Sequence, residues 1–227
     1  MQSARPVVAT LVIVALLLVS GCSAPSTVQA EDDDLGTVDV YEIETDAALS
    51  PTPSGPAHDT MAYVSRDIDD PTQWMLVANA AYADDSDTLL QTLIHEYAHV
   101  LSLNVDQVPE ASGSCETLEL SEGCALPTSF IDEFQVEFWD AYGENAPGPD
   151  NDDADVAYAF YETHEEDFVS DYAATNVTED FAESFAAFVL EAEPDSDSPL
   201  AEKLDFFWNV PEFVEIRAHI SEEFGLE

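Results

Sequence analysis

Apolar residues recur at helical spacing from Ser86 to the C-terminus, and this periodicity limits the fold more than any other feature of the chain. It predicts helices over the ranges 87–103, 129–142, 154–168, 178–192, 198–208 and 211–224. Pro211 suits the first position of the last helix, where no backbone N–H donor is needed. Before the helices, residues 61–66 and 74–82 have the composition of strands. We therefore expect a mainly helical α+β fold.

The first 21 residues resemble a secretory signal peptide, with Arg5 as the only charge ahead of an apolar run. The run ends in Val19-Ser20-Gly21-Cys22, a match to the lipobox in which the cysteine is lipidated and becomes the mature N-terminus. A plain signal-peptidase site with an incidental cysteine is the alternative. The run is too short to span a bilayer, and no later stretch is long and apolar enough. These residues predict a protein outside the cytoplasm, anchored to the cell membrane by lipid on Cys22.

The rest of the chain divides into a tether and one domain. Residues 22–57 are rich in Ser, Thr, Pro, Ala and acids, which predicts a flexible tether, although Val38 and Val40 could instead mark a first strand. Residues 58–227 suit a single domain. Residues 144–155 interrupt the helical pattern and are acidic, but they lack the glycine and glutamate positions of a calcium-binding loop. We interpret them as a solvated loop.

The charge balance is extreme, with 49 acidic residues against four basic ones and a net charge of −45. Such a surface repels nucleic acid and anionic lipid headgroups, so neither is expected as a direct partner. The acidity is compatible with adaptation to high salt, which screens self-repulsion, and with attraction of cationic substrates at ordinary salt. A hydrophobic content of 46% still allows a folded core.

Two cysteines remain beyond Cys22, at Cys115 and Cys124. In an exported chain such a pair most simply forms a disulfide that closes a short loop. Zinc binding by the pair is the alternative, but their spacing is wider than that of structural zinc knuckles. We predict a Cys115–Cys124 disulfide.

The first predicted helix contains His95-Glu96-Tyr97-Ala98-His99. Helix positions i and i+4 share a face about 5–6 Å apart, so both imidazoles can reach one ion. In projection both histidines lie opposite an apolar stripe, and we expect them to face a cleft or solvent. The stripe consists of Leu90, Leu93, Ile94, Tyr97 and Leu101. Glu96 is one position off the histidine face, where it can reach a metal-bound water as general base. A chance match on a solvent-facing helix is the alternative, and catalytic zinc needs a third protein ligand.

The helix predicted at 178–192 offers candidates for that ligand. Its phenylalanines share one face, while Glu179 and Glu183 fall on the opposite face. Asn176-Val177-Thr178-Glu179 could instead form a capping box that holds Glu179 at the helix start, and the residues alone leave both roles open. Asn176-Val177-Thr178 also matches a glycosylation sequon, which we interpret as helix-cap chemistry.

His95-Glu96-x-x-His99, followed by Tyr172, Glu179 and Phe181-Ala182-Glu183, resembles the gluzincin zinc metallopeptidases. The most similar pattern is that of the catalytic domain of anthrax lethal factor and its relatives. In that group a tyrosine stands seven residues before the glutamate ligand, as Tyr172 stands before Glu179. The resemblance covers two short blocks, and it implies a zincin-like metallopeptidase domain.

By this resemblance one catalytic Zn²⁺ is bound by His95, His99 and Glu179. Glu96 would take a proton from the zinc-bound water and pass it to the leaving amine, while Tyr172 would stabilise the oxyanion. Glu183 would orient a ligand imidazole through its other nitrogen, although it shares the face of Glu179 and is the alternative third ligand.

The expected function is hydrolysis of peptide bonds outside the cytoplasm, with cationic peptides favoured by the negative surface. Two other functions are compatible with the residues: a zinc-binding surface lipoprotein without turnover, and a binding lipoprotein with an accidental motif. The remaining histidines, His58, His164 and His219, are interpreted as surface residues.

Overall fold

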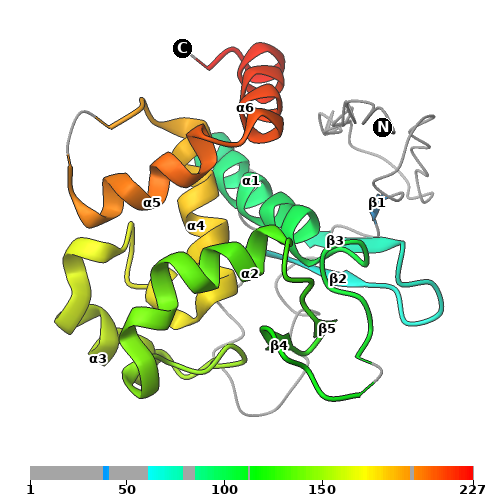
Figure 1. Ribbon diagram of the computed structural model, residues 1–227. Coiled ribbons are helices and arrows are strands. Elements are labelled where there is room, and N and C mark those ends of the chain that lie inside the picture. The colour runs from blue at the N-terminus through cyan, green and yellow to red at the C-terminus, as the bar shows by residue number, and fades with distance from the viewer. Residues whose placement is uncertain (1–37, 41–60, 79–84, 112, 195–196, 227) are drawn as a thin grey trace, which may run out of the picture.

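The computed structural model describes residues 38–40, 61–78, 85–111, 113–194 and 197–226 (Figure 1). The predicted signal peptide, the lipobox and the start of the domain at residue 58 lie outside these ranges, as does most of the tether. Among the described residues, no helix combines the length and the apolar composition needed to cross a bilayer.

A small sheet precedes the helices. It consists of β1 (Val38–Val40), β3 (Trp74–Ala78) and β2 (Ala62–Arg66), in that order. β1 runs parallel and β2 antiparallel to β3, with Val64 opposite Leu76. The strand predicted at 61–66 and the alternative first strand are therefore present, and the strand predicted at 74–82 is present as far as Ala78, beyond which its residues are not described. β2 lies at one edge of the sheet and packs against the first helix.

Four predicted helices appear close to their expected bounds: α1 (Ser86–Leu103), α4 (Val177–Leu190), α5 (Pro199–Trp208) and α6 (Pro211–Phe224). Each of the first three begins after a capping residue, Asp85, Asn176 or Ser198, whose side chain accepts a hydrogen bond from a backbone N–H of the first turn. α6 instead begins at a proline, as predicted. The domain is mainly helical, as the periodicity predicted.

The other two predicted helices are shorter than expected. The segment at 129–142 is divided into α2 (Phe130–Phe134), a π-helical turn (Gln135–Trp139) and a 3-10 segment (Asp140–Asn145). The wide π turn accompanies the burial of Trp139, whose indole N–H donates a hydrogen bond to the Asp180 carboxylate on α4. α3 (Ala154–His164) gives way to a 3-10 turn before Phe168, which is extended and buried.

The core lies where α1, α2, α4, α5 and α6 meet (Figure 1). α4 runs beside α1 and places its phenylalanine face against the other helices, so that Phe181 and Phe185 contact Phe207 and Phe213 with ring centroids 5.1–6.2 Å apart. These side chains are completely buried. The predicted aromatic face of α4 is therefore a core face, which leaves the opposite face of this helix for the polar site.

A disulfide-closed hairpin follows α1. The strands β4 (Glu119–Leu120) and β5 (Gly123–Cys124) pair with each other, and Cys115 is bonded to Cys124, as predicted. A side chain at Gly123 would clash with the backbone of Pro109, 2.1 Å from the carbonyl oxygen. The disulfide suggests a location outside the reducing cytoplasm.

Candidate metal centre

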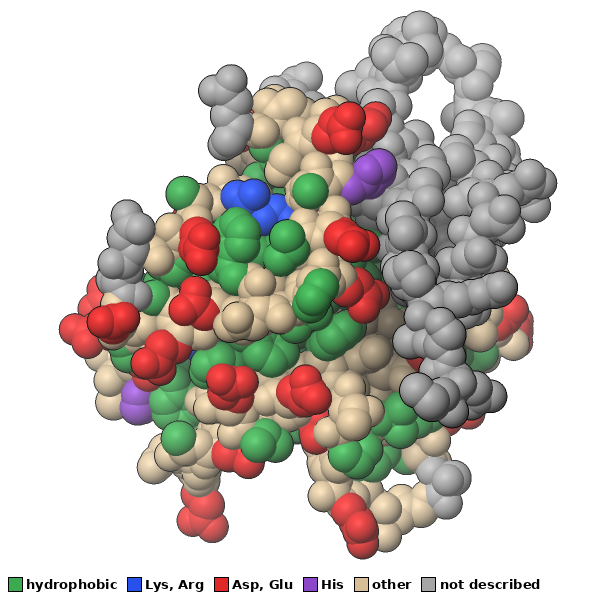
Figure 2. Space-filling view, turned by 45° about the horizontal axis from the view of Figure 1, so that its top comes forward, with side chains coloured by type: hydrophobic (Ala, Val, Ile, Leu, Met, Phe, Trp, Pro, Cys, Tyr) green, Lys and Arg blue, Asp and Glu red, His purple; other side chains and the backbone are tan. Residues whose placement is uncertain are grey.

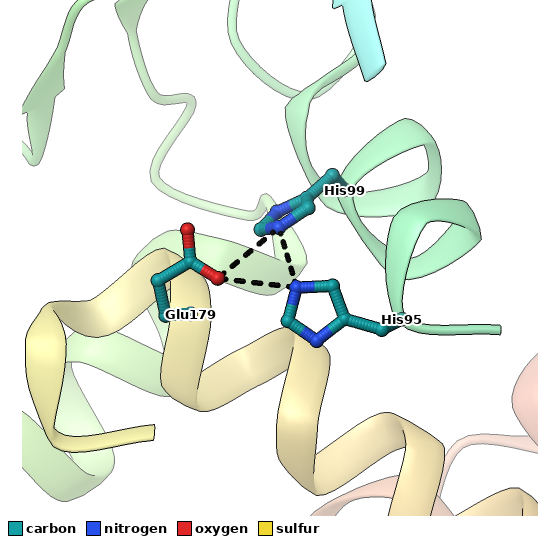
Figure 3. A group of neighbouring side chains, drawn as sticks. All are labelled: His95, His99 and Glu179. Carbon is teal, nitrogen blue, oxygen red and sulfur yellow. Dashed lines mark hydrogen bonds and ion pairs between the residues drawn. The ribbon is translucent and has the colours of Figure 1, made fainter. Parts of the chain in front are cut away.

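Three potential metal ligands converge between α1 and α4 (Figure 3). His95 and His99 extend from successive turns of α1, and Glu179 reaches them from the first turn of α4. His95 Nε2 lies 3.1 Å from His99 Nε2 and 3.1 Å from Glu179 Oε2, and His99 Nε2 lies 3.5 Å from the same oxygen. Among the described residues, this is the group of histidine, cysteine and carboxylate side chains that could hold a metal ion.

The spacing of these atoms suits a small tetrahedral ion. Ligand atoms about 2.0–2.1 Å from a tetrahedral zinc ion lie roughly 3.3–3.4 Å from one another. The three observed separations, 3.1, 3.1 and 3.5 Å, bracket that value. Two imidazoles with one carboxylate are a zinc-type donor set, whereas calcium and magnesium prefer oxygen ligands throughout.

The histidines are not on an open surface, which corrects one of the two predicted surroundings, a cleft or solvent. His95 is 7% exposed and His99 is 9% exposed, and Ser102 on the same side of α1 is fully buried. The reason is that α4 lies over this face, so the second half of α1 is buried on both sides. Bringing two histidines and a carboxylate out of water is unfavourable unless a charged partner compensates, which supports a binding role over a chance match.

Glu183 lies behind His95, one helical turn beyond Glu179. Its Oε1 is 2.8 Å from His95 Nδ1, and its Oε2 accepts a hydrogen bond of 2.8 Å from Ser170 Oγ. With Nδ1–H donated to this carboxylate, a His95 ring that gives up its other proton would present the Nε2 lone pair to a bound ion. Ser170 is a residue that sequence reasoning missed, because nothing in its neighbourhood along the chain signals a contact with Glu183.

The capping contacts of α4 distinguish the two possible roles of Glu179, helix capping and metal binding. Asn176 provides the cap, since its side-chain oxygen accepts from the backbone N–H groups of Thr178 and Glu179 at 2.9 and 3.0 Å. The Glu179 carboxylate is directed instead at the histidines. Asn176 is also buried and donates to Asn151 O, so its side chain is engaged in the cap and not presented as a surface sequon.

Glu96 is buried beside the converging group. It is 7% exposed, and its carboxylate accepts the backbone N–H of Val64 from the edge strand β2. Burial raises the pKa of this carboxyl, and the nearby His99 and His95 partly oppose the shift. Val64 is a second contact absent from the sequence analysis, because a backbone donor leaves no signal in side-chain patterns.

Tyr172 lies at the exposed border of the site. It is 51% exposed, and its ring centroid is 5.8 Å from that of His95. Burial of the hydroxyl raises the pKa of Tyr172, and the Glu179 carboxylate that this hydroxyl faces raises it further. The phenol therefore stays protonated and remains a hydrogen-bond donor at neutral pH.

The carboxylates create a strong preference for positive charge between the helices. Burial lowers the pKa of His95, but the Glu179 and Glu183 carboxylates beside its ring outweigh it and raise this pKa to about 10. Burial raises the pKa of Glu179, yet its contacts with His95 and His99 hold it well below its usual range. Glu179 Oε2 and His99 Nδ1 are buried without a hydrogen-bond partner among the described residues. Without a bound cation, the positive charge beside these carboxylates comes from the protonated His95 ring. A bound cation would supply it instead.

The other residues singled out from the sequence lie elsewhere. His164 is partly exposed, with Nδ1 3.6 Å from Asp167 Oδ2, and His219 is on α6. His58 and Cys22 lie outside the described residues. Residues 144–155 include the end of a 3-10 segment and the N-terminal residues of α3, and Asn151 in this stretch donates to Thr175 O near the start of α4.

Comparisons with protein-family models, with curated proteins and with solved structures gave no match. The structure thus shows a mainly helical domain with a buried His95–His99–Glu179 group that could hold a metal ion.

Proposed function

We propose that the protein is a zinc-dependent peptidase that acts outside the cytoplasm. The observation that carries the proposal is the convergence of His95 Nε2, His99 Nε2 and Glu179 Oε2 in a buried site that also contains Glu96. Glu96 is not needed to hold a metal, and Tyr172 is not either. Their presence beside the converging group therefore supports hydrolysis over metal binding alone.

A zinc ion bound here would supply Lewis acidity toward a substrate carbonyl and would acidify a water molecule. Glu96 accepts the proton of the attacking water on its carboxylate and later delivers it to the leaving amine. The raised pKa of Glu96 suits both transfers. A general acid–base group works best when its pKa lies nearer to the pH of the reaction. The Val64 N–H favours the ionised form of the Glu96 carboxylate, which is the form that accepts a proton.

The Tyr172 hydroxyl donates a hydrogen bond to the substrate carbonyl oxygen as negative charge develops on that oxygen. Tyr172 is half-exposed and lies beside the buried His95, so it can contact a substrate that enters the site from solvent. Glu183 and Ser170 keep the His95 ring oriented through Nδ1, which stabilises the ligand geometry without contact with substrate.

Cationic peptides are the substrates we expect to be favoured. Acidic side chains are spread over the face shown in Figure 2. The basic side chains in the described part of the chain are engaged internally: Arg66 with Val108 O, Lys203 with Asp180, and Arg217 with Phe188 O. The expected preference should weaken at high salt. Equal cleavage of acidic and basic peptides at low and high salt would refute it.

Attachment to the membrane through lipid on Cys22 completes the proposal. The disulfide is consistent with an exported protein, and the lipobox match supplies the anchor. In lipid-modifying bacterial cells, mass spectrometry should find a diacylglyceryl group on Cys22, and Cys22→Ser should release the protein from membranes. A mature N-terminus at another residue would exclude this anchor.

The test of the enzymatic proposal is the substitution Glu96→Gln. We expect the variant to retain stoichiometric zinc and to lose about 10²–10⁴-fold or more in peptide turnover, because the general base is gone while all three ligands remain. Glu137→Gln, an exposed residue away from the converging group, is the matched control and should keep full activity. Peptide cleavage by Glu96→Gln at the wild-type rate would refute the assignment of Glu96 as the general base. Zinc binding without cleavage of any peptide in a library would favour the non-catalytic alternative.

A further inference from the structure

We propose that Asp180, Lys203 and Trp139 are positioning residues that fix the rotation of α4 and thereby hold Glu179 and Glu183 against α1. The inference rests on the metal site proposed above. It concerns a second buried polar cluster, on the other side of the same helix turn, that takes no direct part in metal binding.

Asp180 is the centre of this cluster. It is fully buried, and its Oδ2 accepts from Lys203 Nζ and from Trp139 Nε1, each at 2.7 Å. Ser184 Oγ donates to its Oδ1 at 3.3 Å. Lys203 is 2% exposed, donates also to Asp167 O and lies over the Phe168 ring, with Nζ 4.1 Å from the centroid. The cluster thus ties α4 to α5, to the π turn and to the 3-10 turn after α3.

The position of Asp180 next to Glu179 makes the cluster a rotational constraint. Successive residues of a helix point about 100° apart, so one carboxylate is directed at α1 while the next is directed at α5. A turn of α4 that moved Glu179 away from the histidines would also pull Asp180 from Lys203. That movement would separate a buried ammonium from its buried counter-ion, which is strongly unfavourable.

The apolar contacts of α4 do not provide this constraint to the same degree. Phe181, Phe185 and Phe188 bury a broad face, but hydrophobic attraction is non-directional, so it specifies the rotation of the helix less sharply than hydrogen bonds do. A metal site needs its ligands within about 0.5 Å and 10–20° of the productive geometry. The hydrogen bonds of Asp180 have the directionality that such a tolerance requires.

The test replaces both charges together. Lys203→Met alone leaves a buried carboxylate unpaired, whereas Lys203→Met with Asp180→Asn removes both charges at similar side-chain size. We expect the double variant to recover much of the stability that the single variant loses. Its zinc affinity should nevertheless stay roughly 10–100-fold below wild type, and the visible spectrum of its cobalt-substituted form should change. A purely structural role predicts that affinity and spectrum recover with stability.

Arg217→Met is the matched control, since it removes a basic side chain that contacts the last turn of the same helix, at Phe188 O and Glu191 O. It should leave zinc affinity within about twofold of wild type. If the double variant fails to fold, Trp139→Phe replaces it, with an expected loss of several-fold in zinc affinity. Wild-type affinity and an unchanged cobalt spectrum in the folded double variant would overturn the inference, as would an equal loss in Arg217→Met.

The two proposals fail in distinguishable ways. Wild-type protein that binds zinc but cleaves no peptide defeats the peptidase proposal alone, because the positioning test depends on affinity and spectrum. Wild-type protein that binds neither zinc nor cobalt defeats both.

Discussion

Glu179 and Asp180 are neighbours on α4, yet they belong to two buried polar clusters of opposite character. The Asp180 cluster is complete within the protein: its carboxylate is paired with Lys203 and also accepts from Trp139. The Glu179 cluster is incomplete. Its Oε2 lies close to two imidazole nitrogens without a hydrogen bond, and the Nδ1 atom of His99 has no partner among the described residues.

The difference indicates which cluster is structural and which binds a ligand. Buried polar groups that only support a fold satisfy one another, because any group left over destabilises it. A cluster that keeps three converging ligand atoms and an excess of carboxylates has the composition expected where an additional cation belongs. The following variants test that division.

The largest expected effect on stability is in the complete cluster. Lys203→Met should lower the free energy of unfolding by about 3–5 kcal/mol, because it leaves the Asp180 carboxylate buried without its counter-ion. Urea denaturation in the presence of a chelator measures this effect without a contribution from metal. A decrease in the free energy of unfolding of less than about 1 kcal/mol would mean that the buried Asp180 carboxylate does not need Lys203 as its counter-ion.

Zinc should stabilise the incomplete cluster by a somewhat smaller amount. At free zinc 100-fold above its dissociation constant, the free energy of unfolding of wild type should rise by about 2.7 kcal/mol. Glu179→Gln should abolish this gain, because the variant keeps the size of the side chain but loses the charged ligand. Equal stabilisation of wild type and Glu179→Gln by zinc would contradict the division between the clusters.

The smallest effect is expected behind His95. Glu183→Gln should weaken zinc binding by about 10–100-fold without removing it, because Glu183 contacts Nδ1 and not the converging atoms. Competition with a chromophoric chelator measures the change. Loss of stoichiometric zinc in this variant, with retention in Glu179→Gln, would exchange the roles of the two glutamates.

The sequence allowed only part of the two polar clusters, around Glu179 and around Asp180, to be predicted. His95, Glu96 and His99 are close in sequence on one helix, so their association follows from helical geometry. Glu179 is 84 and 80 residues away from the two histidines, and only the opposing faces of α4 and the family resemblance indicated it. The periodicity also gave four helices nearly correctly, because their caps and prolines are local signals.

The complete cluster was missed for a physical reason. Lys203 and Trp139 are 23 and 41 residues from Asp180, and a lysine within a helical pattern looks like a solvent-exposed residue until the tertiary packing is known. The burial of the histidine face was likewise invisible, since it depends on α4 lying over α1. Local patterns predicted the elements and the ligands on each helix, but not which polar faces the packing would enclose.

The incomplete cluster is proposed to bind one zinc ion through His95, His99 and Glu179. Metal analysis of the purified mature protein after incubation with zinc and removal of excess metal tests it most directly. We expect one zinc per chain in wild type and in Glu96→Gln, and close to none in His99→Ala and Glu179→Gln. No bound zinc in wild type, or full occupancy in the two ligand variants, would contradict it.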